Sequence, residues 1–334
     1  MIKLSIICLA YNHGPYIRQA LEGFVTQKTN FDFEVLIHDD ASTDATADII
    51  REYQQKYPHI IKPIFQTENQ WSKKIGICKN FLYPNIKGKY VAFCEGDDYW
   101  TDENKLQKQV DFLDTHPDYA ICFHPVTVKW EDGSNNHDEI FPKPRYRFYK
   151  KTLTLADLLK HNFIQTNSVV YRWCLQDNFD VLPDGIMPGD YFLHLIHAKT
   201  GKIGFLPDIM AVYRRHSDSV WFGAGYSDEF FIRNGRAHIT FLHEVQKQFN
   251  VDKSANIHST FIKTIAALLK KHDFKSLQML CEKFPQYIPQ ISEDMLYLNS
   301  NLKYARKLDK YKKICIAVGC IYIIMSLFLI WYVL

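Results

Sequence analysis

The first 130 residues of the chain alternate two hydrophobic patterns. Short, continuous apolar runs are typical of buried strands, whereas apolar residues spaced three or four apart are typical of one face of a helix. The expected strands lie at 3–10, 33–39, 60–66, 90–95 and 119–130, and the expected helices at 14–28, 43–57, 71–86 and 101–116. This alternation predicts an α/β fold with a Rossmann-like mixed, mostly parallel sheet flanked by helices, in which ligands bind at the carboxyl ends of the strands.

The pattern changes after residue 130. Residues 131–150 are polar and then basic and aromatic, which predicts a connecting loop. The α/β pattern returns afterwards, with strands expected at 168–173, 202–207 and 210–216 and helices at 155–160 and 191–199. From 226 to 313 the pattern is helical, and this region could dock on the sheet, form a homo-oligomer or act as a stalk. We therefore expect three parts, at 1–225, 226–313 and 314–334.

The last 21 residues, 314–334, contain no charged side chain. About 20 apolar residues are needed to cross the hydrocarbon core of a bilayer, so this segment predicts a transmembrane helix. The residues just before it carry a positive bias that is typical of the cytoplasmic side, from Lys303, Arg306, Lys307, Lys310, Lys312 and Lys313. We expect a C-terminal anchor in the inner, cytoplasmic membrane with the rest of the chain in the cytoplasm. A buried last helix of the globular core is the alternative.

Composition excludes several classes of protein. The formal net charge is only +3 with 23% charged residues, so no overall positive field indicates a nucleic-acid partner. The eight cysteines are scattered, without a CxxC pair or a zinc-like spacing, and indicate reduced thiols. The sequence also lacks GxGxxG and GxxxxGK[ST], so neither a dinucleotide fingerprint nor a P-loop is present.

Three carboxylates crowd the end of the strand expected at 90–95. Glu95, Asp97 and Asp98 surround one glycine in the sequence EGDD, where like charges repel unless a cation or hydrogen-bond donors lie among them. Mg²⁺ or Mn²⁺ is commonly held by one or two carboxylates together with phosphate oxygens, so this stretch predicts a metal-assisted nucleotide site. The alternative is that Asp97 or Asp98 caps the following helix.

Three further stretches are expected near the same edge of the sheet. HDDAST places Asp39 and Asp40 before residues that suit a helix cap, and the two carboxylates could accept hydrogen bonds from a base or a ribose or lie in a solvated turn. Asp190 follows Pro188 and Gly189, and by spacing alone it suits the N-cap of a helix. YRRH ends a strand with His216, where a phosphate or metal contact competes with a solvated basic edge.

Taken in order, five stretches resemble the family 2 glycosyltransferases, which have the GT-A fold. They are SIICLAYNHGPYIRQALEGFVTQ, FEVLIHDDASTDAT, GKYVAFCEGDDYW, MPGDY and YRRH, and together they cover residues 3 to about 220. The resemblance implies a nucleotide-sugar site formed by Ala10, Tyr11, Asn12, Asp39 and Asp97, a metal held by Asp98 and His216, and a catalytic base at Asp190. Glu95 stands where family members often have Asp, and Gly189 where many have a second acid.

The resemblance further implies an inverting, metal-dependent hexosyltransferase. Asp190 would take the proton of an acceptor hydroxyl while a nucleoside diphosphate, UDP by expectation, leaves with Mn²⁺ or Mg²⁺. Together with the membrane segment, this predicts a glycan or lipid-linked acceptor in surface polysaccharide or lipopolysaccharide assembly, with contacts from 131–150 and 161–169. The alternatives are a silent nucleotide-sugar-binding scaffold subunit and a nucleotidyltransferase, although the stretch AYNHGPY lacks the basic, glycine-rich loop that the latter would need.

Overall fold

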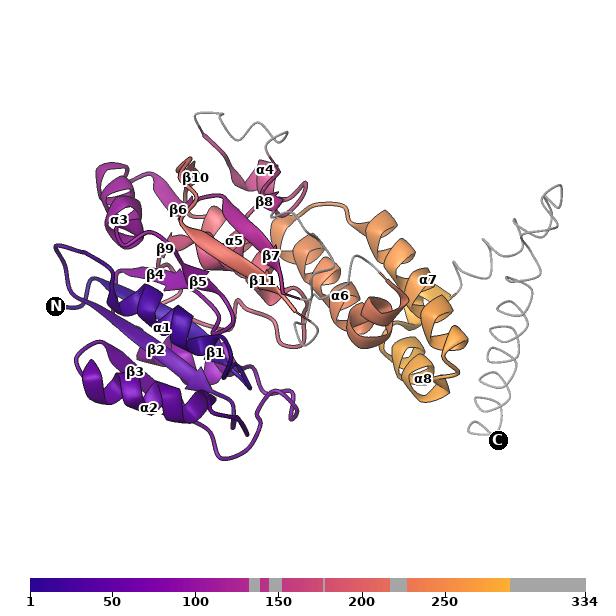
Figure 1. Cartoon of the computed structure of the whole chain (residues 1–334). Coiled ribbons are helices and arrows are strands. Elements are labelled where there is room, and N and C mark those ends of the chain that lie inside the picture. The colour runs from indigo at the N-terminus through magenta and orange to yellow at the C-terminus, as the bar shows by residue number, and fades with distance from the viewer. Residues whose placement is uncertain (132–138, 144–151, 177, 217–226, 289–334) are drawn as a thin grey trace, which may run out of the picture. The chain divides into compact units, whose positions relative to one another are not determined.

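The computed structural model of the chain describes residues 1–131, 139–143, 152–176, 178–216 and 227–288. It divides into two compact units, one that extends to residue 222 and one that begins at residue 223. The first is an α/β unit and the second is helical (Figure 1).

The α/β unit is built on a seven-stranded sheet with the order β10-β6-β9-β4-β1-β2-β3 (Figure 1). Strand β9 is antiparallel to both of its neighbours, and the other pairings are parallel, which confirms the predicted mixed, mostly parallel sheet. The strands are β1 (Leu4–Ala10), β2 (Phe33–Asp39), β3 (Ile61–Phe65), β4 (Tyr90–Phe93), β6 (Tyr119–Phe123), β9 (Val170–Arg172) and β10 (Lys202–Phe205).

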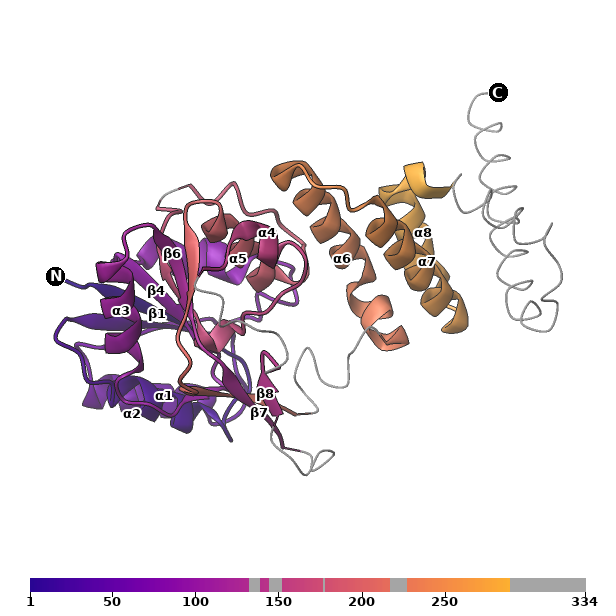
Figure 2. The same ribbon diagram turned by 90° about the horizontal axis from the view of Figure 1, so that it is seen from above.

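Both faces of this sheet are covered, so its central strands are almost wholly buried. Alternate residues of each strand point to opposite faces. Leu4, Ile6 and Cys8 belong to the core shared with α1 (Ile17–Val25), α2 (Thr46–Lys56) and α3 (Lys105–Thr115). On the other face, His38 packs on Phe81 of the short segment η1 (Cys78–Leu82). The remaining helices of this unit, α4 (Leu155–Leu158) and α5 (Gly189–Ala198), come later in the chain. Figure 2 shows the same unit from above.

A second, four-stranded sheet has the order β5-β11-β7-β8. Its strands are β5 (Tyr99–Trp100), β7 (Val126–Trp130), β8 (Glu139–Phe141) and β11 (Ala211–Arg215). The single strand predicted at 119–130 is therefore wrong: β6 ends at Phe123, Pro125 cannot donate a ladder hydrogen bond, and β7 joins the other sheet. This second sheet brings β11 beside β5, directly after the acidic residues.

The helix predicted at 71–86 is also wrong. Only the short turns η1 and η2 (Tyr83–Asn85) form there. The carboxylate of Asp40 instead accepts hydrogen bonds from the backbone N–H of Gln70 at 2.7 Å and of Trp71 at 3.0 Å. The chain leaves helical geometry at Lys74, whose positive φ of 61° lies in the left-handed region, and the bonds from Asp40 hold the segment before it as a loop.

The second unit packs α6 (Asp228–Phe249), α7 (Ser254–Lys270) and α8 (Phe274–Lys283) together (Figure 2). Gly235 on α6 faces Thr264 on α7, where a Cβ would lie only 2.2 Å from Thr264 Oγ1, so the close approach of the two helices requires glycine. No helix within the described residues is long and apolar enough to cross a membrane. The membrane helix predicted at 314–334 lies outside the described residues.

Lys105 is a cation inside the core of the α/β unit. Its side chain is fully buried, Nζ donates to Gln109 Oε1 at 2.8 Å, and Nζ lies 4.1 Å from the ring centroid of Trp100. Burial lowers the pKa of this ammonium group from 10.5 to about 7. Between these two pKa values the unfolded chain binds more protons than the folded chain. The free energy of unfolding of wild type therefore rises with pH over this range.

We expect the gain in the free energy of unfolding of Lys105→Met over wild type to be largest at low pH. Its free energy of unfolding relative to wild type should fall by about 2–4 kcal/mol between about pH 6 and about pH 10, because one pKa unit corresponds to about 1.4 kcal/mol. Urea unfolding followed by circular dichroism at both pH values measures this difference. Lys56→Met, at an exposed position in the last turn of α2, is the control. A Lys105→Met difference that does not change with pH would contradict the prediction.

Candidate active site

The acidic turn, residues 95–98, follows β4 and is held by one arginine. The side chain of Arg214 on β11 is buried. Its backbone N–H donates to Asp98 Oδ1 at 2.9 Å, Nη1 donates to the carbonyl of Asp97 at 2.7 Å, and Nε donates to Glu131 Oε1 at 2.9 Å. The second sheet therefore fixes the backbone of the turn and one oxygen of Asp98 from the side of β11.

Asp97 lies between two histidines. His216 Nε2 is 3.1 Å from Asp97 Oδ2, and His13 Nε2 is 3.9 Å from the same oxygen. Burial opposes the ionisation of Asp97, but the hydrogen bond with His216 and the charge of His13 outweigh it and lower the pKa of Asp97. Burial lowers the pKa of His13 in turn. The structure thus brings Asp97 and His216 together, although 118 residues separate them in the sequence.

For the other two carboxylates of the acidic turn, the effects that raise the pKa are the larger ones, although Arg214 lowers the pKa of Asp98. Burial and the nearby charges of Asp97 and Glu95 raise the pKa of Asp98 well above its usual value. Burial and the charges of Asp97 and Asp190 raise the pKa of Glu95 to about 8. Asp97 Oδ1 and Asp98 Oδ2 are buried and have no hydrogen-bond partner among the described residues. The turn therefore presents acceptor oxygens that the described residues leave unsatisfied.

These oxygens fit a divalent cation that is only partly coordinated by protein. Within the described ranges, no group of three or more His, Cys, Asp or Glu side chains is placed to hold a metal ion. Mn²⁺ and Mg²⁺ are commonly bound by one or two carboxylates with the remaining positions filled by phosphate and water oxygens. Asp98 Oδ2, which has no partner among the described residues, and His216, which contacts the neighbouring Asp97, suit such a shared site.

Helix capping does not explain the acidic turn. Helix α3 begins at Lys105, and Asp102 rather than Asp97 or Asp98 accepts a backbone N–H there, from Asn104 at 2.8 Å. The alternative in which Asp97 or Asp98 caps this helix is therefore wrong. Their positions are set by the second sheet and not by the helix.

The loops after β1 and β2 hold each other. Asn12 has a positive φ of 53°, its N–H donates to Ser42 Oγ at 2.9 Å, and its side-chain oxygen accepts from the N–H of Thr43 at 2.8 Å. The carbonyl of Ala10 accepts from the N–H of Asp40 at 3.0 Å. The contacts of Ala10 and Asn12 therefore fix the shape of the two loops.

Asp39 and Tyr11 are the side chains of these loops with open contacts. Asp39 is buried, and its Oδ2 accepts from the N–H of Ser42 at 3.3 Å. Its Oδ1 is buried without a partner among the described residues. Tyr11, one loop away, is 45% exposed. An unpartnered carboxylate oxygen suits the N–H group of a nucleobase, and an exposed aromatic ring suits its flat face.

Asp190 lies in the first turn of α5. The helix begins at Gly189 with Pro188 at the N-cap position, so Asp190 is inside the helix and the N-cap interpretation of Asp190 is wrong. Asp190 Oδ1 accepts from the N–H of Tyr191 at 2.8 Å, and Oδ2 accepts from Thr166 Oγ1 at 2.7 Å. The charge of Asp190 contributes to the raised pKa of Glu95, so the two carboxylates lie within reach of each other's charge.

Three residues that sequence analysis did not assign to the site take part in it. Arg214 and His13 contact the acidic turn, and Thr166 contacts Asp190. The sequence YRRH offered a signal for Arg214, since residues two apart on a strand point to the same face and His216 was already assigned. The stretch 161–169, which contains Thr166, was expected to contact the acceptor, but its contact with Asp190 depends on how two distant segments pack.

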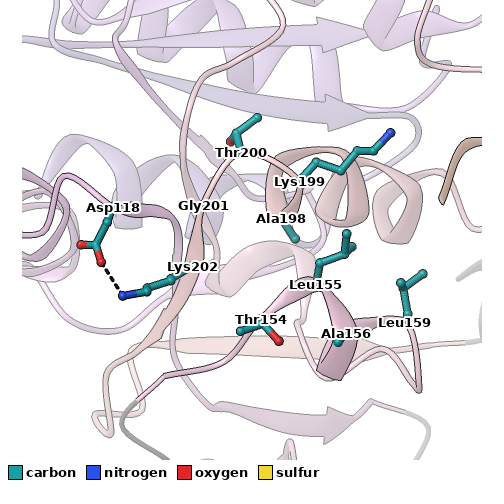
Figure 3. A pocket seen from close by; sticks show the side chains of 10 residues that line it. All are labelled: Asp118, Thr154, Leu155, Ala156, Leu159, Ala198, Lys199, Thr200, Gly201 and Lys202. Atoms are coloured by element: carbon teal, nitrogen blue, oxygen red, sulfur yellow. Dashed lines mark hydrogen bonds and ion pairs between the residues drawn. The ribbon is translucent and has the colours of Figure 1, made fainter. Parts of the chain in front are cut away.

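A shallow hollow of about 630 Å³ lies elsewhere, at the opposite end of α5 (Figure 3). Ala198 and Lys199 at the end of that helix, Leu155 on α4 and Lys202 on β10 line it. Lys202 is paired with Asp118 at 2.7 Å, as the dashed line shows. Asp190 belongs to the first turn of α5 and the hollow to its last residue, so the hollow is separate from the acidic turn.

The comparison with protein families agrees with this geometry. The sequence matches the model of glycosyl transferase family 2 over residues 5–222, so the chain belongs to the family 2 glycosyltransferases. Uncharacterized proteins of Mycobacterium tuberculosis and Mycobacterium bovis are 48% identical over 237 residues, which is 70% of this chain and 65% of theirs. The chain thus spans somewhat less than two thirds of the length of these relatives.

More distant relatives carry descriptions of activity. The Escherichia coli protein WfaP, a UDP-Glc:alpha-D-GlcNAc-diphosphoundecaprenol beta-1,3-glucosyltransferase, is 35% identical over 34% of this chain and 43% of its own. Among solved structures, Staphylococcus aureus TarS in complex with UDP-GlcNAc has a TM-score of 0.54 at 22% identity, over 86% of this chain and 79% of that chain. A mannosyltransferase from Pyrobaculum calidifontis with GDP-Man and Mn²⁺ has a TM-score of 0.52 at 17% identity, over 95% and 86%. These two structures share the fold.

Proposed function

We propose that the protein transfers a hexose from a nucleotide-sugar donor, by preference a UDP-sugar, to a hydroxyl group of a glycan or lipid-linked acceptor. The observation that carries this proposal is the acidic turn, where Asp97 Oδ1 and Asp98 Oδ2 are buried without partners and Asp190 is close enough to influence the pKa of Glu95. A divalent cation bound with a nucleoside diphosphate supplies the positive charge that these carboxylates need. The acceptor hydroxyl meets the general base, Asp190, on the other side of the donor sugar.

Each part of the proposed site has its own residues. Asp39 Oδ1 accepts a hydrogen bond from an N–H group of the nucleobase, and the exposed ring of Tyr11 covers the face of the nucleobase. Asp98 and His216 hold Mn²⁺ or Mg²⁺, which when bound neutralises the charge that develops on a leaving diphosphate. Asp97 keeps His216 in place, and Ala10 and Asn12 maintain the shape of the loops.

Asp190 is the proposed general base. Its carboxylate takes the proton of the acceptor hydroxyl as the oxygen attacks the anomeric carbon, while the bond from that carbon to the diphosphate breaks. Attack from the face opposite the leaving group inverts the anomeric configuration. No covalent intermediate with the enzyme is required, and no nucleophilic side chain is needed at the site.

We further propose that 314–334 anchors the chain in the cytoplasmic membrane, with the glycosyltransferase unit in the cytoplasm. Support comes from the 21 uncharged residues and the basic segment before them. An anchored enzyme meets lipid-linked acceptors of surface polysaccharide or lipopolysaccharide assembly within the plane of the membrane. We expect the full chain to remain with membranes in alkaline carbonate and to be released by detergent. Release by carbonate alone would contradict the anchor.

A donor panel tests the proposed activity. The full-length protein, in detergent with Mn²⁺, is incubated with UDP-glucose, UDP-N-acetylglucosamine and GDP-mannose in the presence of bacterial lipid extracts, and the release of UDP or GDP is measured. Turnover of one donor, absent with chelator, is the expected result. Binding of a donor without any turnover would instead favour the scaffold alternative, and neither binding nor turnover would overturn the proposed function.

A further inference from the structure

The turn formed by residues 166–168 lies inside the α/β unit, beside the proposed base. It forms the short helical segment η3 (Thr166–Ser168), and all three residues are buried. Sequence analysis expects the surrounding stretch 161–169 to contact the acceptor. The burial of Asn167 and Ser168, both with 0% of their surface exposed, indicates instead that this turn supports the site from within.

Hydrogen bonds fix the 166–168 turn to three elements. Trp100 Nε1 on β5 donates to the carbonyl of Asn167 at 2.9 Å, and Asn167 Nδ2 donates to the carbonyl of Val212 on β11 at 2.9 Å. Gln109 Nε2 on α3 donates to the carbonyl of Ser168 at 2.9 Å. The turn is therefore tied to β5 and β11, the two strands that also flank the acidic turn.

One side chain of this turn reaches the proposed base. Thr166 Oγ1 donates to Asp190 Oδ2 at 2.7 Å, while the other oxygen of Asp190 accepts from the N–H of Tyr191. The bond between Asp190 and Tyr191 lies within α5, so it does not fix the helix to another element. The Thr166 hydroxyl is the contact that relates Asp190 to the sheet, and its side chain, only 9% exposed, has little freedom to choose another partner.

We propose that Thr166 is a positioning residue for Asp190. The hydroxyl fixes the orientation of the carboxylate relative to β5 and β11, and through Arg214 on β11 relative to Asp98. Because the acceptor hydroxyl must attack in line with the bond to the leaving diphosphate, a base that is displaced by about 1 Å lowers the rate by on the order of 100-fold. This inference rests on the proposed function, since it concerns how Asp190 is held for proton transfer.

Two substitutions at Thr166 separate its hydroxyl from its volume. Thr166→Val keeps the branched shape and removes the donor, whereas Thr166→Ser keeps the donor and removes a methyl group. We expect Thr166→Val to lower kcat by about 10-fold to 100-fold with the KM for the donor unchanged, and Thr166→Ser to recover most of the wild-type kcat. The assay is UDP or GDP release by the full-length protein from the donor in the panel above that wild type uses best.

Controls distinguish this role from a loss of folding. Thr264→Val removes another buried threonine hydroxyl, which donates to the carbonyl of Thr260 within α7, and is expected to leave kcat unchanged. Thermal unfolding is measured for every variant. A wild-type kcat in folded Thr166→Val, or an equal loss in Thr166→Val and Thr166→Ser, would overturn the inference. The proposed function fails separately, if wild type turns over no donor, whereas wild-type turnover by Asp190→Asn would overturn the assignment of the base and with it this inference.

Discussion

Replacing Asp190 with asparagine is expected to lower kcat by about 10²-fold to 10⁴-fold while nucleotide binding stays unchanged. The amide has nearly the same shape as the carboxylate but cannot take a proton, and a positioned general base contributes a rate factor of about this size. The Thr166 hydroxyl can rotate to accept from an amide as readily as it donates to a carboxylate, so the local structure is retained. Steady-state release of UDP or GDP, with UDP binding measured separately, gives the two quantities.

Asp184→Asn is the matched control for this variant. Asp184 is an exposed carboxylate in the segment that precedes α5, and its loss removes the same charge from the same part of the chain. We expect wild-type kcat from Asp184→Asn. A kcat within a few-fold of wild type in Asp190→Asn would show that another group takes the proton and would contradict the assignment of the base.

The second large effect concerns Asp98, where we expect asparagine to stabilise the cation-free fold and abolish the cation-dependent site. Burial beside Asp97 and Glu95 makes a charged Asp98 unfavourable, and the neutral amide can still accept the hydrogen bond from the N–H of Arg214. We expect the free energy of unfolding in chelator at neutral pH to rise, because the wild-type carboxyl group is either charged in a buried site or takes up a proton on folding.

The same variant should lose the stabilisation that ligands give to wild type. A ligand present at about 100 times its Kd stabilises a native protein by about 2.7 kcal/mol. With Mn²⁺ and UDP, the melting temperature of wild type should rise, and that of Asp98→Asn should not. Asp111→Asn, on the exposed face of α3, is the control and should respond as wild type does. An Asp98→Asn protein that is stabilised by Mn²⁺ and UDP as strongly as wild type would contradict the metal assignment.

Hydrophobic pattern was sufficient to predict the large sheet and most of its helices, because strands buried on both faces leave continuous apolar runs. It failed where a distant contact decided the local structure. The segment at 71–86 has apolar spacing typical of a helix, but Lys74 has a positive φ of 61°, and Asp40 from another loop holds the backbone at Gln70 and Trp71. Pro125 was visible in the sequence and still gave no indication that β6 and β7 belong to different sheets, since that depends on the pairing of β7 with β11.

The candidate site divides in the same way. Asp97 and Asp98 were predicted from the sequence because crowded charge at a strand end is unfavourable without a ligand, whereas the role of Asp190 came from the resemblance to the family. The contacts of Arg214 and Thr166 with them were not predicted, although both residues lie in stretches that the sequence singled out, because each contact joins residues far apart in the chain. Residue chemistry thus indicates candidate groups, and packing determines which groups position them.

The central claim is that the acidic turn binds a nucleoside diphosphate together with a divalent cation. Calorimetric titration of the full-length protein in detergent with UDP, first with Mn²⁺ and then with chelator, tests it most directly, and GDP titrated in the same way tests the preference for the base. The account predicts saturable binding of UDP that requires Mn²⁺ and is absent in Asp98→Asn. Equal binding with chelator, or no binding of either nucleotide in the presence of Mn²⁺, would contradict it.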